Sequence, residues 1–254
     1  MNIKDRVALV TGSSRGIGRA VARELAGRGC KVIVHGSGQS QALERSFEDV
    51  KRISPDSIMI VADFADSSVI DAMFAGIDKA FGRIDILINN AFIQFENPLL
   101  DIKQEQWDTE LTVNLRAPFL CSQHAARLMR DKNQGGKIIN IGSVHAREPK
   151  RNFAGYSVSK AGLEMLTKSL AMELAQHNIQ ANCLILGAIA TDSTPPKRQE
   201  KIVSSIPADR IGTTDEVARL VAFLCSNECD YITGGSIAVD GGLTLGFSAS
   251  RPEL

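Results

Sequence analysis

A glycine-rich turn between a short apolar strand and a helix constrains the fold of this chain most. Residues 7–10 (Val-Ala-Leu-Val) are apolar throughout, and a helical pattern further on puts Ile17, Val21 and Leu25 on one stripe. Glycines let the backbone approach a diphosphate, and a helix N-terminus supplies N–H donors and positive potential. This order predicts a dinucleotide-binding turn, with an ordinary strand-to-helix connection as the alternative. The turn reads Thr11-Gly12-Ser13-Ser14-Arg15-Gly16-Ile17-Gly18, with the glycine spacing G-x-x-x-G-x-G.

Strands and helices alternate along the whole chain. The predicted strands are short, apolar and rich in β-branched residues, as buried parallel strands should be. Alternation of this kind predicts one domain over residues 1–254, a doubly wound parallel sheet of about seven strands with helices on both faces. We predict strands at 7–11, 31–35, 57–62, 84–89, 137–142, 180–186 and 236–239, and helices near 16–28, 40–53, 67–81, 104–130, 154–176 and 214–226.

The longest irregular insertion covers residues 187–212. It carries Pro195, Pro196 and Pro207 among scattered charges. Long insertions in compact domains are often functional loops. We therefore expect a mobile loop or a short helix pair over a cleft, where it would contact the substrate.

Composition excludes several classes of function. The 254 residues have a formal net charge of zero and a pI of about 6.9, so nothing indicates a surface for nucleic acid or membrane. No apolar run approaches the roughly 18 residues of a membrane span, and the N-terminus lacks the apolar stretch of a signal peptide, so we expect a cytoplasmic protein. The five cysteines are an odd number without C-x-x-C spacing. We expect reduced, mostly buried thiols and no metal site.

Tyr156 and Lys160 stand about one helical turn apart, downstream of Ser143. A phenol normally loses its proton near pH ~10. A neighbouring cation favours the phenolate, so we expect Lys160 to lower the pKa of Tyr156 and make it a proton donor or acceptor near neutral pH. Taken alone, the spacing leaves a solvated surface pair open as the alternative.

Small and polar residues gather where the predicted strands end. Ligands of doubly wound sheets bind beyond the carboxyl ends of the strands, so these residues are candidates for a cofactor site. Turn-forming preference explains each of them singly, but explains their joint occurrence poorly. They are Thr11–Gly12, His35–Gly36, Asp63, Asn89-Asn90-Ala91, Ser143 and Gly187.

Taken together, the motifs resemble the short-chain dehydrogenase/reductase family. The glycine-rich turn, Asn89-Asn90-Ala91, Asn114, Ser143, Tyr156 and Lys160 occur in the order and spacing of that family, and Val239-Asp240-Gly241-Gly242 is similar to its typical ending. The resemblance covers nearly the whole chain and implies an NAD(P)-binding Rossmann fold. It also implies hydride transfer between the cofactor and a ketone or secondary alcohol, and a homotetramer formed through helices 104–130 and 154–176 and the C-terminal strand.

The resemblance also implies roles for individual residues. Tyr156 would be the general acid and base, and Ser143 would hydrogen-bond the substrate oxygen. Lys160 would bind the nicotinamide ribose and Asn114 would hold a water of the proton relay. The cofactor contacts implied by the family are Gly12, Ser14, Arg15, Gly16, Ile17, Gly18, Ser37, Asp63, Asn90, Ala91, Tyr156, Lys160, Ile189 and Thr191.

Two positions depart from the pattern of the family. Phe92 follows Asn-Asn-Ala where a glycine is usual, so either the backbone differs there or the ring sits over the cleft. Leu186-Gly187 replaces the common Pro-Gly after the sixth strand. Both departures concern the shape of the nicotinamide pocket.

The end of the second predicted strand indicates the choice of cofactor. An acidic residue there would bind the ribose 2′-hydroxyl and repel a 2′-phosphate, but the chain reads His35-Gly36-Ser37-Gly38-Gln39. Arg15 and Ser37 would suit a 2′-phosphate. We therefore expect NADP(H) to be preferred over NAD(H), with a merely solvated Arg15 as the alternative.

Substrate identity is mostly hidden. Gln94, His145, Phe153 and the 187–207 segment are candidates for the substrate pocket. Basic residues between 147 and 151 suit either an acidic substrate or a solvated loop. A ketone/alcohol oxidoreductase competes with a non-catalytic NAD(P)-binding regulator or scaffold on the same fold. Enoyl reduction is a third hypothesis, disfavoured because such enzymes usually space Tyr and Lys more widely.

Overall fold

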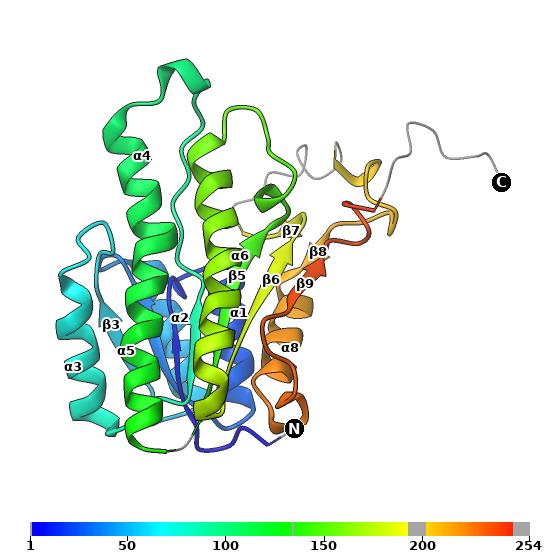
Figure 1. The fold of residues 1–254 in the computed structure, drawn as a ribbon. Helices are drawn as coiled ribbons and strands as arrows, with labels where there is room; N and C mark the ends of the chain where they lie inside the picture. Colours follow the sequence, from blue (N-terminus) through cyan, green and yellow to red (C-terminus); the bar gives the residue numbers. More distant parts are fainter. Residues whose placement is uncertain (1, 134, 193–201, 246–254) are drawn as a thin grey trace.

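Seven parallel strands form one sheet in the order β3-β2-β1-β4-β5-β6-β9 (Figure 1). The structure, a computed structural model, describes residues 2–133, 135–192 and 202–245. The order reverses between β1 and β4, which makes their carboxyl ends the switch point where ligands bind in such sheets. The predicted sheet is confirmed. Its strands are β1 (Val7–Val10), β2 (Lys31–Gly36), β3 (Ile58–Val61), β4 (Ile86–Asn89), β5 (Gly136–Ser143), β6 (Ile179–Leu186) and β9 (Ser236–Val239).

Helices cover both faces of the sheet (Figure 1). On one face, α1 (Gly16–Gly27), α2 (Gln41–Ile53) and α8 (Thr214–Leu224) share a buried cluster with Ala8 and Val10 of β1. On the other face, α3 (Val69–Phe81), α5 (Ala117–Asp131) and α6 (Ala154–Leu174) share a cluster with Val7 and Leu9. Alternate residues of one strand therefore feed two separate cores, which is why these strands are apolar throughout.

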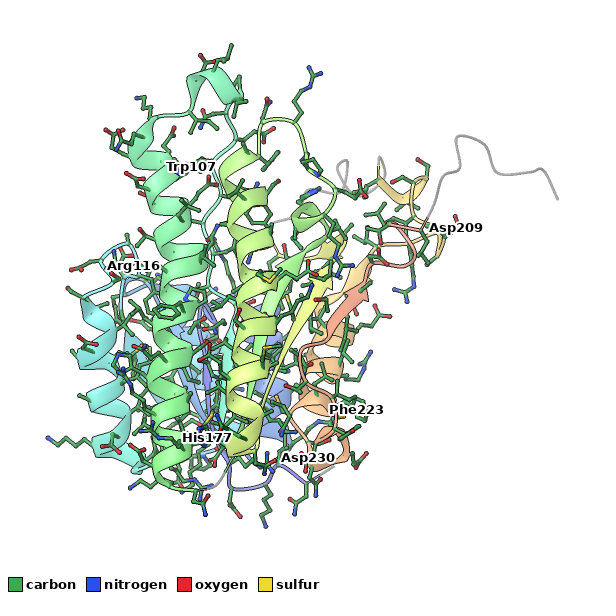
Figure 2. All side chains as sticks on the ribbon, viewed as in Figure 1. Trp107, Arg116, His177, Asp209, Phe223 and Asp230 are labelled. Carbon is green, nitrogen blue, oxygen red and sulfur yellow. The ribbon has the colours of Figure 1, made fainter. Side chains whose placement is uncertain are left out.

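The helix expected over 104–130 is interrupted. It consists of α4 (Gln104–Leu111), a π turn (Thr112–Arg116) and α5. At the end of the π turn the N–H of Ala117 bonds the carbonyl of Thr112, five residues back. Pro118 follows and lacks the N–H that a regular helix would direct at Asn114, which favours the wider turn. Figure 2 labels Trp107 on α4 and Arg116 at the end of the π turn.

The insertion at 187–212 is not wholly irregular. β7 (Ile189–Ala190) pairs with β8 (Gly212–Thr213) in parallel, so its two ends lie together. Pro195 and Pro196 lie outside the described residues, and the expected mobility remains a prediction.

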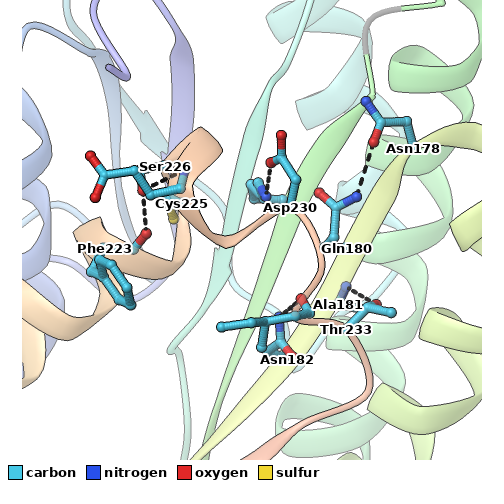
Figure 3. Close-up of polar contacts among 12 residues, drawn as sticks. Asn178, Gln180, Ala181, Asn182, Phe223, Cys225, Ser226, Asp230 and Thr233 are labelled. Carbon is cyan, nitrogen blue, oxygen red and sulfur yellow. Dashed lines mark hydrogen bonds and ion pairs between the residues drawn. The ribbon is translucent and has the colours of Figure 1, made fainter. Parts of the chain in front are cut away.

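The segment after α8 is fastened to β6 by side chains. Thr233 Oγ1 accepts the N–H of Ala181 at 3.1 Å, and Asn182 donates to the carbonyl of Ile232 at 2.8 Å (Figure 3). Asn182 also accepts the N–H of Gly235 at 3.0 Å. These bonds place β9 at the edge of the sheet, beside β6.

The remaining features of the fold are its cysteines, the hydropathy of its helices and its short 3-10 turns. All five cysteines are buried free thiols, as expected. Among the helices of the described residues, none combines the length and the hydropathy that crossing a bilayer would take. The 3-10 turns are Leu99–Asp101, Val144–Ala146, Ala175–His177 and Asn227–Cys229.

Candidate functional site

The glycine-rich turn lies against the end of β4 so closely that side chains are excluded. Gly12 has a φ of +61°, and a Cβ there would lie 2.8 Å from the Cα of Ala91. A Cβ on Gly18 would lie 2.5 Å from Asn90 Nδ2. Asn90 Nδ2 donates to the carbonyls of Thr11 and Gly12, each at 2.9 Å, and so holds the turn in place. The predicted residues of β1 and β4 therefore form one backbone cradle.

The N-terminus of α1 opens at this cradle. Its N-cap residue, Arg15, is extended (φ −157°) and makes no side-chain hydrogen bond to the helix, and the first turn contains no acidic residue. The first N–H groups of a helix have no partner within it. The end of α1 is thus a favourable place for an anion.

His35 ties the turn to β2 and β3. Its Nδ1 accepts the N–H of Gly12 at 3.0 Å, and its Nε2 lies 2.9 Å from the carbonyl of Ala62. A carbonyl only accepts, so Nε2 carries the proton and the ring is neutral. The ring stacks on Phe64 at 4.4 Å, and burial lowers the pKa of His35 to about 4. From the sequence, His35 was predicted only to lie at the end of a strand. Its position just before Gly36, level with the glycine turn, was the available signal.

Acidification should loosen this part of the fold. The folded pKa of His35, about 4, lies below the ordinary value of 6.5, so the unfolded chain binds the proton first. Stability should therefore fall as the pH is lowered from 6.5 to about 4, by up to about 3 kcal/mol from this residue. Urea unfolding of the wild type and of His35→Asn, measured across this range, tests it. The variant should show a shallower dependence, and identical slopes would contradict the assignment.

Ser143, Tyr156 and Lys160 meet at the carboxyl end of β5. Ser143 ends that strand, and its hydroxyl hydrogen-bonds with the phenol of Tyr156 on α6. Lys160 Nζ donates to the carbonyl of Ile141 at 2.8 Å and lies 5.7 Å from the centroid of the Tyr156 ring. Both α6 side chains are buried and turn towards the end of β5, so the surface-pair alternative is excluded.

The expected lowering of the Tyr156 pKa by Lys160 is wrong in this structure. Burial raises the pKa of Tyr156, the hydrogen bond with Ser143 lowers it, and the charge of Glu110 raises it again. Lys160 is itself desolvated, and burial lowers its pKa to about 8. The sequence spacing predicted that the two groups are neighbours, but not that both would be buried. Removal from water disfavours both the phenolate of Tyr156 and the ammonium of Lys160.

Asn114 lies in the π turn, fully buried. Its Oδ1 accepts the N–H of Ile93 at 2.8 Å, while its Nδ2 donates to the Ile93 carbonyl at 2.8 Å and to Ser159 Oγ at 3.1 Å. The side chain therefore joins the segment after β4 to α6. The predicted member of the site is present, with its side chain bonded to protein groups.

Two further residues of α4 hold the same extended segment. Glu110 Oε1 accepts the N–H of Phe95 at 2.8 Å, and Gln106 Oε1 accepts from Asn97 Nδ2 at 3.2 Å. One helical turn and two residues of extended chain cover similar lengths, so residues 106, 110 and 114 can each reach a residue of the segment. Burial alternates accordingly, with 93, 95 and 97 half-buried and 92, 94 and 96 exposed. Glu110 was not among the predicted residues, although its four-residue spacing from Asn114 was a signal.

Phe92 lies against Tyr156 and near Lys160 without backbone strain. It has no positive φ, so the backbone avoids the left-handed region. Its ring is 57% exposed and contacts Tyr156 edge-on at 6.1 Å between centroids. Lys160 Nζ lies 5.6 Å from the centroid of the same ring. His145 contacts the Tyr156 ring from another side, at 6.5 Å.

The remaining predicted residues lie along the same edge of the sheet. Arg15 and Ser37 are exposed. Asp63 is exposed too and accepts the N–H of Ala65 at 3.1 Å. Thr191 faces Gly16 closely, since a Cβ on that glycine would lie 3.5 Å from Thr191 Cγ2. Ser14, just before the N-cap of α1, and Ile17, in its first turn, are half-buried. Leu186 is buried at the end of β6, and Gly187 and Ile189 follow it.

Known proteins with this sequence pattern and fold are numerous. A family model described as Enoyl-(Acyl carrier protein) reductase matches residues 12–244. The 3-oxoacyl-[acyl-carrier-protein] reductase FabG of Escherichia coli is 39% identical over 248 residues, covering 96% of this chain and 100% of that protein. The FabG of Staphylococcus aureus is 39% identical over 241 residues, covering 94% and 98%.

Solved structures agree with the sequence relatives. The acetoin dehydrogenase YohF from Salmonella typhimurium superposes with a TM-score of 0.89 at 34% identity, covering 97% of this chain and 99% of that one. The acetoin dehydrogenase from Enterobacter cloacae superposes with a TM-score of 0.88 at 36% identity, covering 99% and 100%. The chain therefore belongs to the short-chain dehydrogenase/reductase family of NAD(P)-dependent oxidoreductases.

Proposed function

We propose that this protein is an NADP(H)-dependent oxidoreductase that interconverts a ketone and a secondary alcohol, with Tyr156 as general acid and base. The observation that carries the proposal is the hydrogen bond between the Ser143 hydroxyl and the Tyr156 phenol, with the Lys160 ammonium beside them. These groups lie at the same edge of the sheet as the glycine-rich turn. A protein that only binds the cofactor has no need of a buried phenol held in this way.

Each group has a distinct task in carbonyl reduction. Tyr156 donates its hydroxyl proton to the carbonyl oxygen, and Ser143 donates a hydrogen bond to the same oxygen as its charge develops. Lys160, whose Nζ lies 5.7 Å from the centroid of the Tyr156 ring, would bind the ribose of the nicotinamide. Pro118 has no N–H to donate to the Asn114 carbonyl, and we propose that this oxygen holds a relay water. When bound, the nicotinamide supplies the hydride in reduction and receives it in oxidation.

The residues present fit a dinucleotide. Gly12 and Gly18 leave no room for side chains between the turn and β4, and the open N-terminus of α1 suits a diphosphate. We propose as cofactor contacts the residues that the family implies: Gly12, Ser14, Arg15, Gly16, Ile17, Gly18, Ser37, Asp63, Asn90, Ala91, Tyr156, Lys160, Ile189 and Thr191.

The preference for NADP(H) rests on the end of β2. Residues 35–40 contain no carboxylate, the nearby Asp63 belongs to the segment after β3, His35 is engaged with Gly12 and Ala62, and Arg15 and Ser37 are exposed. Replacing Arg15 by Ala should lower kcat/KM for NADPH about tenfold or more, because a charge-assisted phosphate contact is lost, and should change kcat/KM for NADH little. Steady-state kinetics with both cofactors measures this. A wild type that prefers NADH would refute the preference.

A ketone is the substrate class that the site supports best. The two kinds of relative are named as a 3-oxoacyl-[acyl-carrier-protein] reductase and as acetoin dehydrogenases. The family model carries the name of an enoyl reductase, but Tyr156 and Lys160 have the four-residue spacing that the sequence analysis associates with carbonyl reduction. Gln94, His145, Phe153 and the 187–212 segment would shape the pocket. NADPH consumption against 3-oxoacyl thioesters, acetoin, sugars and enoyl thioesters tests the proposal, and consumption with enoyl thioesters alone would refute it.

A homotetramer is proposed through the long helices and the C-terminal strand. Phe119 and Met165 are exposed on α5 and α6, 42% and 60% respectively, beside a groove of about 630 Å³. Leu163, by contrast, belongs to the interior. Replacing Phe119 by Asp should convert tetramers to smaller species, because a charge would be buried unpaired. Sedimentation velocity decides it, and a monomeric wild type would contradict the proposal. The groove is lined by Asp108, Leu111, Thr112, Leu115, Arg116, Phe119 and Leu166.

A further inference from the structure

Glu110 is a buried carboxylate between the two segments that flank Tyr156. Its side chain is on α4, with the residue only 3% exposed. Oε1 accepts the N–H of Phe95 at 2.8 Å on the extended segment after β4. Oε2 lies against the first turn of α6, where a Cβ added to Gly155 would overlap it. One carboxylate therefore touches both walls of the candidate site.

The carboxylate stands at the positive end of α6. The N-cap of α6 is Phe153, which provides no side-chain hydrogen bond, and the first turn of α6 contains no acidic residue. Glu110 therefore supplies from another helix the negative charge that a helix N-terminus favours. In the part of the chain that the structure describes, burial and the hydrogen bond from Phe95 act on the carboxyl of Glu110, and no cationic side chain does.

Tyr156 is the titratable group that Glu110 influences. The negative charge of Glu110 opposes ionisation of the phenol and raises the pKa of Tyr156. Burial in turn raises the pKa of Glu110, against its bond from Phe95. Lys160 on α6 and His145 on the turn after β5 are further ionisable groups near the phenol, and Cys183 interacts with Lys160. The adjoining elements carry more: Glu96 on the extended segment, Glu105 and Asp108 on α4, Arg116 in the π turn, Arg147, Glu148, Lys150 and Arg151 between β5 and α6, and Glu164, Lys168 and Glu173 along α6.

We propose that Glu110 is a positioning residue that braces the two walls of the site, holding the segment after β4 and the first turn of α6, which carries Tyr156, at a fixed distance from each other. The geometry is that of a brace, with one oxygen on the segment carrying Phe92 and the other on the turn carrying Tyr156. Its catalytic consequence rests on the proposed function. A phenol that stays protonated near neutral pH is poised to act as an acid, so the brace favours carbonyl reduction over alcohol oxidation.

The matched substitution is Glu110→Gln. The amide oxygen still accepts the N–H of Phe95, while the charge is removed. Glu105→Gln, an exposed carboxylate on the same helix, is the control. Should the Gln variant fail to fold, Glu110→Met provides a second uncharged side chain of similar size.

The acidity of Tyr156 can be read without any substrate. The chain has two tyrosines, Tyr156 and the fully exposed Tyr231, so ultraviolet titration of the phenolate with Tyr156→Phe as the blank isolates one group. Over the range in which circular dichroism stays native, Glu110→Gln should titrate about one pH unit lower than the wild type, as expected for removal of one unpaired nearby charge. Glu105→Gln should match the wild type. Coincident curves for Glu110→Gln and the wild type would overturn the proposal.

Kinetics separate this inference from the proposed function. The rising limb of kcat/KM against pH for alcohol oxidation should move down by the same amount, because the phenolate forms earlier. If Glu110→Gln shifts the titration but the protein shows no turnover, the proposed role of Glu110 is supported and the proposed oxidoreductase function is refuted. Turnover with an unshifted titration and an unshifted pH profile would refute the brace alone.

Discussion

Replacing Tyr156 by Phe should nearly abolish turnover while cofactor binding stays within about twofold of the wild type. Only the hydroxyl is removed, since the ring keeps its contacts with Phe92 and His145. General acid catalysis by a positioned side chain contributes roughly 10²–10⁴-fold, so kcat should fall by that much. The cradle around Gly12 and Asn90 is not in contact with the hydroxyl, and the affinity for NADPH should survive.

The matched control is Tyr231→Phe. Tyr231 is fully exposed and lies on the segment after α8, so its loss should change neither kcat nor binding. Initial rates of ketone reduction and fluorescence titration with NADPH measure the two quantities. Unchanged turnover in Tyr156→Phe would exclude the proposed role. It would also favour the competing hypothesis of a cofactor-binding regulator, in which Tyr156 has no chemical task.

Replacing Gly18 by Ala should remove cofactor binding and destabilise the fold. The added Cβ would lie 2.5 Å from Asn90 Nδ2 and 2.9 Å from the Cα of Ser13, so the cradle must open. Asn90 would then lose its bonds to the carbonyls of Thr11 and Gly12. Overpacking of this kind costs about 1–3 kcal/mol of stability. Because the turn itself is displaced, we expect the affinity for NADPH to fall about 100-fold, which corresponds to roughly 2.7 kcal/mol.

Gly27→Ala provides the control at the other end of α1. A Cβ there meets nothing within 4 Å, and the residue has no positive φ. It should leave binding unchanged and be neutral or stabilising by up to about 1 kcal/mol, because alanine is the better helix former. Isothermal titration with NADPH and thermal unfolding compare the two variants. Equal affinity in Gly18→Ala and Gly27→Ala would contradict the cradle as the cofactor site.

The fold was predictable because its signals are local. The apolar β-branched strands, such as residues 137–142, are buried on both faces and leave little ambiguity in period or length. Parallel strands put their carboxyl ends on one edge, so Thr11, Asn90 and Ser143 were expected to gather there, as the structure shows. The spacing of the glycines in the turn also indicated the cradle, because glycine is needed where two backbone segments approach each other closely.

The parts that were missed depend on packing between distant elements. The π turn follows from Pro118 together with the docking of Asn114 onto Ile93, and a sequence shows only the proline. His35 acts through carbonyl and amide groups whose positions exist only in the folded sheet. The pKa of Tyr156 depends on how completely the site is desolvated and on Glu110, which is distant in sequence. The spacing of residues in the sequence predicts which side chains are neighbours, but their burial in the fold determines the free-energy cost of ionising them.

The most direct test of the central claim is transfer of deuterium from labelled cofactor to product. NADPH deuterated at both C4 positions is incubated with the purified protein and the best ketone of the substrate panel, and the product is analysed by mass spectrometry. The account predicts one deuterium on the carbinol carbon per NADPH oxidised, with the rate of transfer in Tyr156→Phe lowered by the same roughly 10²–10⁴-fold as kcat. Tight NADPH binding without labelled alcohol from any ketone, acetoin or 3-oxoacyl thioester would contradict it.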